Sequence, residues 1–202
     1  MLYKILKPLA VMLAKFFFRL EVKGGENVPR QGGFILASNH LSYLDPVILG
    51  VASPRKLNFM ARHDLFAIPV FSSFIRSLGA FPLRRDFADI ASIKEALRRL
   101  RQAWGLVLFP EGSRAFDGLE RKAEPGIGFI AAKSDVPVVP AYISGTQKAL
   151  PRHARFIRLT KIRVYFGKPI YPEGSDNYEG FASRILQEIK RLGEMNPALL
   201  AI

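Results

Sequence analysis

Short apolar runs that alternate with helical segments constrain the fold of this chain of 202 residues more than any other feature. A continuous apolar run of about five residues bounded by Gly or Pro indicates a strand buried on both faces. Such strands are predicted at residues 18–22, 33–37, 57–61, 79–83, 105–109, 136–143 and 162–166. Helical spacing of apolar residues is clearest at 86–104 and near the C-terminal end of the sequence. We therefore predict an α/β fold, a single domain with a mixed, largely parallel sheet flanked by helices.

The first 20 residues differ from this pattern. Apolar side chains are interrupted by Lys4, Lys7, Lys15 and Arg19, and the longest uncharged run covers only residues 8–14. That run is far shorter than the roughly 20 residues that cross a bilayer. We expect residues 1–20 to form an N-terminal amphipathic helical segment in a membrane interface and residues 21–202 to form the α/β domain. The alternative is an ordinary helix packed on the domain.

A His and an Asp stand five residues apart at the exit of the strand 33–37. Residues 39–46 read Asn-His-Leu-Ser-Tyr-Leu-Asp-Pro. On a regular helix His40 and Asp45 would point about 140° apart. Asp-Pro is a helix-start signature, so we expect Asp45 to cap a helix and His40 to lie in the turn before it. An imidazole oriented by a carboxylate can take a proton from a hydroxyl. The alternative is a capping Asp with an unrelated His nearby.

A second polar stretch, residues 109–114, reads Phe-Pro-Glu-Gly-Ser-Arg and follows the strand 105–109. Sites in parallel sheets gather at the carboxyl ends of strands. Arg114, with Arg84 or Arg85 from the exit of the strand 79–83, can grip a phosphate bidentately. The alternative is a tight surface turn with a local ion pair.

The charge balance favours anionic partners. Lys and Arg number 30 against 17 acidic residues, a formal net charge of +13. The chain has no cysteine, which excludes disulfides and a thiolate nucleophile, and its three His residues lack metal-ligand spacing. Residues 126–131 match a dinucleotide fingerprint formally but follow Glu-Pro rather than a strand, so we expect helix packing there. The polar face of the helix 86–104 is predicted to be solvated and carries Lys94, Arg98, Arg99 and Arg101.

Four motifs in order give the chain a family resemblance. Residues 39–45 match a His-four residues-Asp motif, residues 62–66 with Pro69 and the continuation 79–85 match a second, and 109–114 and 136–140 match a third and a fourth. Over roughly residues 20 to 170 the chain resembles the glycerolipid acyltransferases, most closely those acting on 1-acylglycerol-3-phosphate (lysophosphatidic acid). The α/β domain 21–202 would then be the acyltransferase domain.

The resemblance implies a role for each matching residue. His40 would be the general base on the acceptor hydroxyl and Asp45 would orient it. The hydroxyl would attack the thioester of acyl-CoA or acyl carrier protein directly, with no acyl-enzyme intermediate. Arg62 and Arg85, the favoured member of the pair Arg84 and Arg85, would bind the acceptor's phosphate. The remaining substrate-binding positions are Glu111, Gly112, Ser113 and Arg114.

The resemblance also implies partners and location. The acceptor would be lysophosphatidic acid, acylated on its sn-2 hydroxyl to phosphatidic acid in phospholipid biosynthesis. The donor, acyl-CoA or acyl carrier protein, is a substrate, and neither a cofactor nor a metal is expected. An anionic membrane surface is the expected support, at the cytoplasmic face of the cell membrane, with the protein monotopic or peripheral. The basic run formed by Arg152, Arg155, Arg158, Lys161 and Arg163 is either a solvated edge or a docking site for CoA phosphates or lipid headgroups.

Three departures from the family pattern leave the acceptor open. Arg62 stands where Lys is usual, Asp64 where Glu is usual, and Glu124 where many members have Lys. The same chemistry on glycerol-3-phosphate or a lyso-aminolipid therefore remains an alternative. A further alternative is a non-catalytic basic module that binds membrane or nucleic acid. Nucleic acid is not expected, because the Phe residues lie in apolar runs rather than among basic residues.

Overall fold

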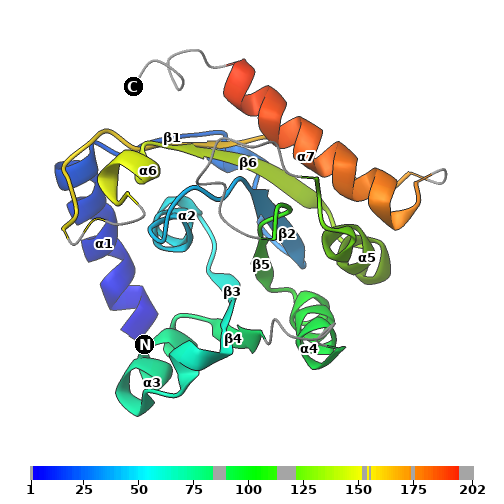
Figure 1. Cartoon of the computed structure of the whole chain (residues 1–202), viewed down its shortest axis with the longest axis horizontal. Coiled ribbons are helices and arrows are strands. Elements are labelled where there is room, and N and C mark those ends of the chain that lie inside the picture. The colour runs from blue at the N-terminus through cyan, green and yellow to red at the C-terminus, as the bar shows by residue number, and fades with distance from the viewer. Residues whose placement is uncertain are drawn as a thin grey trace.

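The computed structural model describes residues 2–83, 90–112, 122–151, 154, 156–173 and 176–195. Helices cover both faces of one twisted sheet (Figure 1). The strands are β1 Glu21–Lys23, β2 Phe34–Ser38, β3 Leu57–Arg62, β4 Ala80–Leu83, β5 Gly105–Leu108, β6 Val138–Ser144 and β7 Arg163–Phe166. The α-helices are α1 Leu2–Phe18, α2 Asp45–Ala52, α3 Pro69–Ser77, α4 Ile90–Arg101, α5 Pro125–Ser134, α6 Thr146–Ala149 and α7 Tyr178–Glu194. Short 3-10 turns are η1 Gly25–Asn27 and η2 His63–Phe66.

The sheet is mixed and largely parallel, which confirms the predicted fold class. Its order is β1-β7-β6-β2-β5-β3-β4. The strands from β6 to β4 in this order all run parallel to one another, whereas β7 is antiparallel to β6 and β1 runs parallel to β7. Ala37 of β2 is level with Leu108 of β5 and Pro140 of β6. The exits of these three strands therefore meet at one edge of the sheet.

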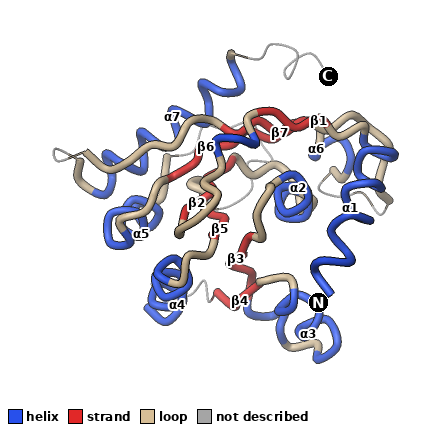
Figure 2. Tube along the Cα trace, turned by 180° about the vertical axis from the view of Figure 1, so that it is seen from behind, coloured by secondary structure: helices blue, strands red, loops and turns tan. Residues whose placement is uncertain are grey.

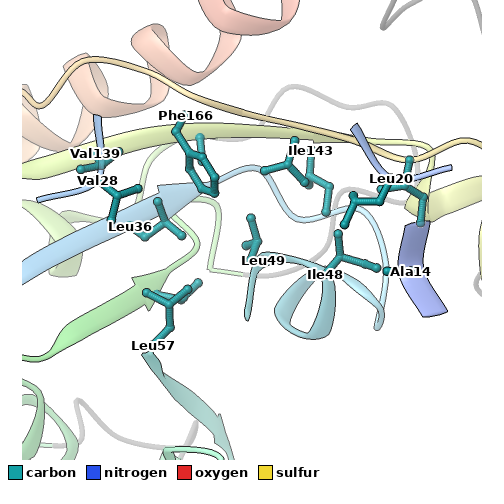
Figure 3. Close-up of a cluster of buried hydrophobic side chains, with 14 of the residues drawn as sticks. Ala14, Leu20, Val28, Leu36, Ile48, Leu49, Leu57, Val139, Ile143 and Phe166 are labelled. Atoms are coloured by element: carbon teal, nitrogen blue, oxygen red, sulfur yellow. The ribbon is translucent and has the colours of Figure 1, made fainter. Parts of the chain in front are cut away.

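Strand β2 separates two hydrophobic cores. Phe34 and Leu36 pack on the side of α1 and α2, and Ile35 and Ala37 pack on the side of α4, α5 and α7. Figure 3 shows the first core, with Leu36 of β2 near Leu49 of α2. Figure 2 shows the same two helical layers from behind. Because both faces are covered, the central strands are continuously apolar, as the sequence pattern predicted.

Helix α1 is joined to the domain. Ala14 is buried in the first core, and Lys7 Nζ donates to the carbonyl of Ser53 at the end of α2. The backbone of Ile162 donates to Phe18 O at 2.9 Å. Much of the opposite face of α1 is exposed and apolar, formed by Ile5, Leu9, Met12, Leu13, Phe16 and Phe17. Among the described helices, none combines the length and the apolar character required to cross a membrane. The membrane-facing role of α1 stays a prediction.

Two local predictions were wrong. The strand expected at 18–22 starts later, because Phe18 still belongs to α1 and β1 covers Glu21–Lys23. Arg99 does not lie on a solvated face: its side chain is mostly buried and donates to Asn58 Oδ1 and, at 3.2 Å, to Gly79 O. The guanidinium carbon of Arg99 also lies 4.6 Å from the centroid of the Phe81 ring. Arg99 therefore joins α4 to the sheet.

Gly128 of α5 serves helix packing, as expected, whereas a Cβ at Gly126 would meet no atom within 4 Å. A Cβ at Gly128 would lie 1.9 Å from the backbone oxygen of Tyr178. Helices α5 and α7 therefore approach so closely that only Gly fits at this position. The dinucleotide motif at 126–131 is explained without a nucleotide.

Candidate active site

The turn after β2 holds a histidine against a buried carboxylate. His40 Nδ1 lies 2.8 Å from Asp45 Oδ2. The backbone N–H groups of Leu41 and Ser42 donate to the same oxygen at 2.6 and 2.7 Å. Asp45 is fully buried, whereas the side chain of His40 is 17% exposed. The pair thus joins a fixed, inaccessible carboxylate to an imidazole that a substrate can reach.

Two polar side chains fasten this turn to the neighbouring strand. The β2–β6 ladder ends at Ser38, and the Asn39 side chain continues the pairing in place of backbone. Its Nδ2 donates to Ile143 O at 2.9 Å, and its Oδ1 accepts from Ile143 N at 2.8 Å. Ser42 Oγ donates to Leu150 O at 3.0 Å. The buried side chains of Asn39 and Ser42 thus find partners across the sheet exit, which holds the turn in place.

Asp45 does not cap helix α2, contrary to the prediction. Leu44 is the N-cap, Asp45 is the first helical residue and Pro46 the second. The carboxylate turns back to the N–H groups of residues 41 and 42 instead of those of its own helix. The error is one residue, because Asp45 is already helical and its carboxylate accepts from the turn before the helix. This geometry lets His40 and Asp45 meet despite their unfavourable spacing.

The orientation of the ring defines which nitrogen can react. A carboxylate accepts but does not donate, so Nδ1–H of His40 donates to Asp45 and the neutral ring keeps its lone pair on Nε2. Nε2 lies on the side of the ring opposite to Nδ1, away from Asp45. Phe109 stacks on the ring with centroids 3.9 Å apart and an interplanar angle of 15°. The imidazole is fixed by an edge contact and a face contact, and Nε2 can act as a proton acceptor.

The loop after β5 lies beside this histidine. Phe109 begins it, and Gly112 adopts φ +64 with its N–H donating to Phe109 O at 3.0 Å. Glu111 is half-buried close to Tyr142. Burial raises the pKa of the Tyr142 phenol, and the negative charge of Glu111 raises it further. Ser113 and Arg114 lie outside the described residues.

Glu124 lies at the foot of the same loop. Its N–H donates to Pro110 O at 2.7 Å, and a Cβ on Gly112 would come within 2.9 Å of Glu124 Cγ. The positive φ and this close side chain both favour Gly at position 112. An acidic group therefore stands next to the third motif, at a position where many family members have Lys.

Arg62 at the end of β3 forms an exposed ion pair. Its Nε donates to Asp64 Oδ1 at 3.0 Å, and a second donor reaches Oδ2; both side chains are about half exposed. The hydrogen bonds raise the pKa of Arg62 and lower the pKa of Asp64. Tyr43 of the histidine turn also acts electrostatically on Arg62, so the two are neighbours. Arg84 and Arg85 lie outside the described residues.

The structure therefore brings together some of the predicted site residues. His40, Asp45 and the loop with Glu111 and Gly112 lie at adjacent strand exits, and Arg62 borders the histidine turn. Sequence reasoning assigned no role to Asn39 or Phe109, although both stand in the motifs. Their positions at the exits of two predicted strands were the only feature of the sequence that could have indicated a role in the site. Among the described residues, no group of three or more His, Asp or Glu side chains could hold a metal ion.

An α/β sheet whose strand exits present an oriented imidazole is equipped for base-assisted group transfer to a hydroxyl. Residues 19–144 match the family model described as Acyltransferase. A chloroplastic 1-acyl-sn-glycerol-3-phosphate acyltransferase of Brassica napus is 30% identical over 79% of this chain and 47% of its own length. A 1-acyl-sn-glycerol-3-phosphate acyltransferase of Bacillus subtilis is 28% identical over 75% of this chain and 77% of its own.

The fold agrees with these sequence matches. The crystal structure of the 1-acyl-sn-glycerophosphate (LPA) acyltransferase PlsC from Thermotoga maritima superposes with a TM-score of 0.79 at 26% identity, covering 96% of this chain and 81% of that one. The chain belongs to the acyltransferase family. The resemblance drawn from its motifs is thereby confirmed. The chain spans about half the length of the plant relatives it matches.

Proposed function

We propose that this protein transfers an acyl group from acyl-CoA or acyl carrier protein to the sn-2 hydroxyl of lysophosphatidic acid. His40 Nε2 takes the hydroxyl proton while the oxygen forms a bond to the thioester carbonyl carbon. The carbon–sulfur bond then breaks and the leaving thiolate takes up the proton held on Nε2, which restores the neutral imidazole. The products are phosphatidic acid and the free thiol of the donor. The proposal is supported by the family match and by relatives named for this acceptor.

The observation that carries the proposal is the Asp45 oxygen shared by three donors. Oδ2 accepts from His40 and from the backbone at Leu41 and Ser42, inside a fully buried environment. A negative charge held there stabilises the imidazolium that forms when Nε2 takes a proton. A hydroxyl is a poor nucleophile at neutral pH, whereas a thioester is already activated. Base assistance and positioning therefore suffice in this proposal, without a metal or a cofactor.

The acceptor's phosphate would bind beside the histidine turn. Arg62 is accessible and already makes a bidentate contact with Asp64, which occupies the same donors that a phosphate would use. A phosphate can replace this carboxylate because the pair is exposed and water-screened. Arg85 or Arg84, together with Arg114 and Ser113, would complete the phosphate and glycerol contacts. Glu111 and Gly112 would line the same pocket.

The membrane would support the enzyme through α1. Its exposed apolar face and the net charge of +13 fit a helix lying among anionic headgroups. A surface-bound enzyme reaches an acceptor whose tail stays in the bilayer. We place it at the cytoplasmic face of the cell membrane, as a monotopic or peripheral protein.

A second candidate keeps the chemistry and changes the acceptor to glycerol-3-phosphate or a lyso-aminolipid. The specific observation in its favour is Glu124, whose side chain lies next to Gly112. A carboxylate there repels a phosphate and attracts an ammonium group, so of these two acceptors it favours the lyso-aminolipid. The acceptor panel below separates the two candidates.

The test is acyl transfer in anionic vesicles with labelled acyl-CoA and labelled acyl carrier protein as donors. Lysophosphatidic acid, glycerol-3-phosphate and a lyso-aminolipid are compared as acceptors, for wild type and His40→Ala. We expect phosphatidic acid from the first acceptor with wild type only. Transfer to another acceptor alone would correct the substrate and keep the mechanism. Vesicle binding without transfer to any acceptor would instead support the non-catalytic module.

A further inference from the structure

A short loop between α6 and β7 exposes three large apolar side chains. Phe156, Ile157 and Leu159 are 82%, 54% and 72% exposed. Arg158, between them, is exposed as well. Single exposed apolar residues are ordinary, but three within four residues form a patch that marks a contact surface. The backbone of the loop is held in place by α6, because the N–H of Arg158 donates to Ala149 O at 2.8 Å.

This loop continues the exposed face of α1. Ile162, just after it, donates to Phe18 O at 2.9 Å and accepts from Glu21 N at 3.0 Å. Lys161 forms an ion pair with Glu21, the first residue of β1. Figure 1 shows the loop beside the C-terminal end of α1, and Figure 2 agrees from behind. Phe16, in the last turn of α1, is 78% exposed. The loop therefore adjoins the end of the helix that carries Phe16.

The charge around the loop selects an anionic occupant. The sequence contains no Asp or Glu between Asp135 and Glu173. The same stretch holds seven basic residues, Lys148, Arg152, Arg155, Arg158, Lys161, Arg163 and Lys168. Glu21 of β1 forms ion pairs with two of these cations, Lys161 and Arg163, and the other five leave an excess of positive charge. Apolar side chains interleaved with excess cations are typical of segments that enter the headgroup region of an anionic bilayer.

We propose that residues 156–159 insert into an anionic lipid bilayer as a second membrane element next to α1. Phe156, Ile157 and Leu159 reach the acyl boundary, while the exposed Arg158 stays at the headgroups. Two separate contacts fix the tilt of the domain on the membrane, which one helix alone does not. The inference rests on the membrane-facing role proposed for α1. It adds a second membrane contact, from a loop far from α1 in the sequence.

Single-cysteine labelling tests the insertion directly, because the chain contains no cysteine. The full chain carrying Leu159→Cys, Phe16→Cys or Ile90→Cys is labelled with a nitrobenzoxadiazole fluorophore. Ile90 is a matched control, 65% exposed on α4 at the other side of the molecule. Vesicles contain phosphatidylcholine with 30% phosphatidylglycerol or phosphatidylcholine alone. We expect a blue-shifted emission at positions 159 and 16 with the anionic vesicles and no change at position 90.

Partitioning of a charge variant gives a second measurement. Phe156→Glu with Leu159→Glu should lower the vesicle partition coefficient about tenfold or more, because burying each side chain favours binding and each new carboxylate opposes it. Ile90→Glu should leave it unchanged. Insertion at position 16 with an unshifted label at 159 would overturn the inference, as would a label at 159 that responds to CoA without vesicles.

Activity separates this inference from the proposed function. A water-soluble lysophosphatidic acid with a short acyl chain needs no membrane contact. The double variant should turn over this acceptor at the wild-type rate and the vesicle-bound acceptor more slowly. Loss of turnover with both acceptors would contradict a role confined to membrane binding. Absence of acyl transfer in the wild type would defeat the proposed function and leave the labelling result standing.

Discussion

Two side-chain pairs at nearby strand exits differ in almost every physical respect. His40 and Asp45 follow β2, and Asp45 is completely buried under three hydrogen bonds to one oxygen. Arg62 ends β3, Asp64 stands two residues later, and both side chains are about half exposed. The first pair is fixed by the fold, whereas the second is an exposed contact that water or a ligand can exchange.

The difference separates two tasks within one site. A base must keep one orientation through every turnover, so its carboxylate partner is buried and its ring is stacked on Phe109. A phosphate-binding group must release its product. An exposed carboxylate partner that competes only weakly with phosphate for the same donors is therefore suitable. The comparison predicts large effects on rate at the first pair and moderate effects on affinity at the second.

The largest effect is expected from Asp45→Asn. The amide oxygen of Asn carries no charge to stabilise an imidazolium. If the side-chain NH₂ group of Asn instead occupied the position of Oδ2, it would be a donor facing the donors of His40, Leu41 and Ser42. We expect kcat to fall by about 10²–10⁴-fold. Asp64→Asn is the matched control and should change kcat less than about threefold, because a surface pair contributes little. Steady-state kinetics with vesicle-bound acceptor give both values. Equal losses in the two variants would break the distinction.

Asn39→Ala should mainly reduce stability. It leaves the N–H and the carbonyl of Ile143 without the partners that Asn39 supplies, at a cost of about 1–3 kcal/mol. Asn58→Ala is the control, because Asn58 is also a buried amide and donates to Gly105 O at 3.1 Å, away from the histidine turn. Denaturant unfolding should show similar losses for both, while kcat falls only for Asn39→Ala. If kcat also fell in Asn58→Ala, the loss of kcat in Asn39→Ala would be explained by general destabilisation of the fold.

Arg62→Gln sharpens the second half of the comparison. We expect KM for lysophosphatidic acid to rise about tenfold with kcat little changed, since a charge-assisted hydrogen bond to the phosphate is lost at an exposed position. Arg62→Lys should recover part of the affinity because the charge remains. Initial rates over a range of acceptor concentrations measure both. An unchanged KM in Arg62→Gln would remove Arg62 from the acceptor site.

The smallest effect concerns a purely structural pair. Hydrogen bonds from Arg98, then Arg99, lower the pKa of Glu95 from 4.5 to about 2. The folded form therefore gains stability above pH 4.5 and loses this gain as the pH falls towards 2. Glu95→Gln should cost less than about 1 kcal/mol at pH 7, because the pair is partly exposed and screened. Urea unfolding at pH 7 and pH 3 should show a smaller difference at pH 3, with kcat unchanged. A constant difference across this range would disprove the linkage.

Much of the fold was predictable from local pattern. Strands buried on both faces leave continuous apolar runs, so β2, β5 and β6 were found within one or two residues. The end of α1 was missed because the apolar residue Phe18, predicted to begin the strand, is still the last residue of α1, whereas β1 is a three-residue, exposed strand that reads Glu-Val-Lys. Arg99 was expected in solvent because its helix face is basic. Its burial follows from Asn58 and Phe81, which only the tertiary fold brings to it.

The site was predictable where chemistry and spacing coincide. His40, Asp45 and the loop at Glu111 stand in motifs, whereas the partner of Asn39 lies 104 residues away in the sequence. No local pattern reveals such a contact. The stacking of Phe109 on His40 likewise depends on β5 lying next to β2. The roles of Arg84, Arg85, Ser113 and Arg114 stay predictions, because these residues lie outside the described part of the chain.

The central claim is that Nε2 of His40 accepts the proton of the acceptor hydroxyl. The most direct test measures phosphatidic acid formation by His40→Ala in anionic vesicles, with and without added imidazole, after circular dichroism and vesicle binding have matched the wild type. We predict a loss of about 10²–10⁴-fold and partial recovery with imidazole, which can occupy the vacated volume beside Phe109 and act as the base. A folded, vesicle-bound His40→Ala protein that forms phosphatidic acid within threefold of the wild-type rate would contradict the claim.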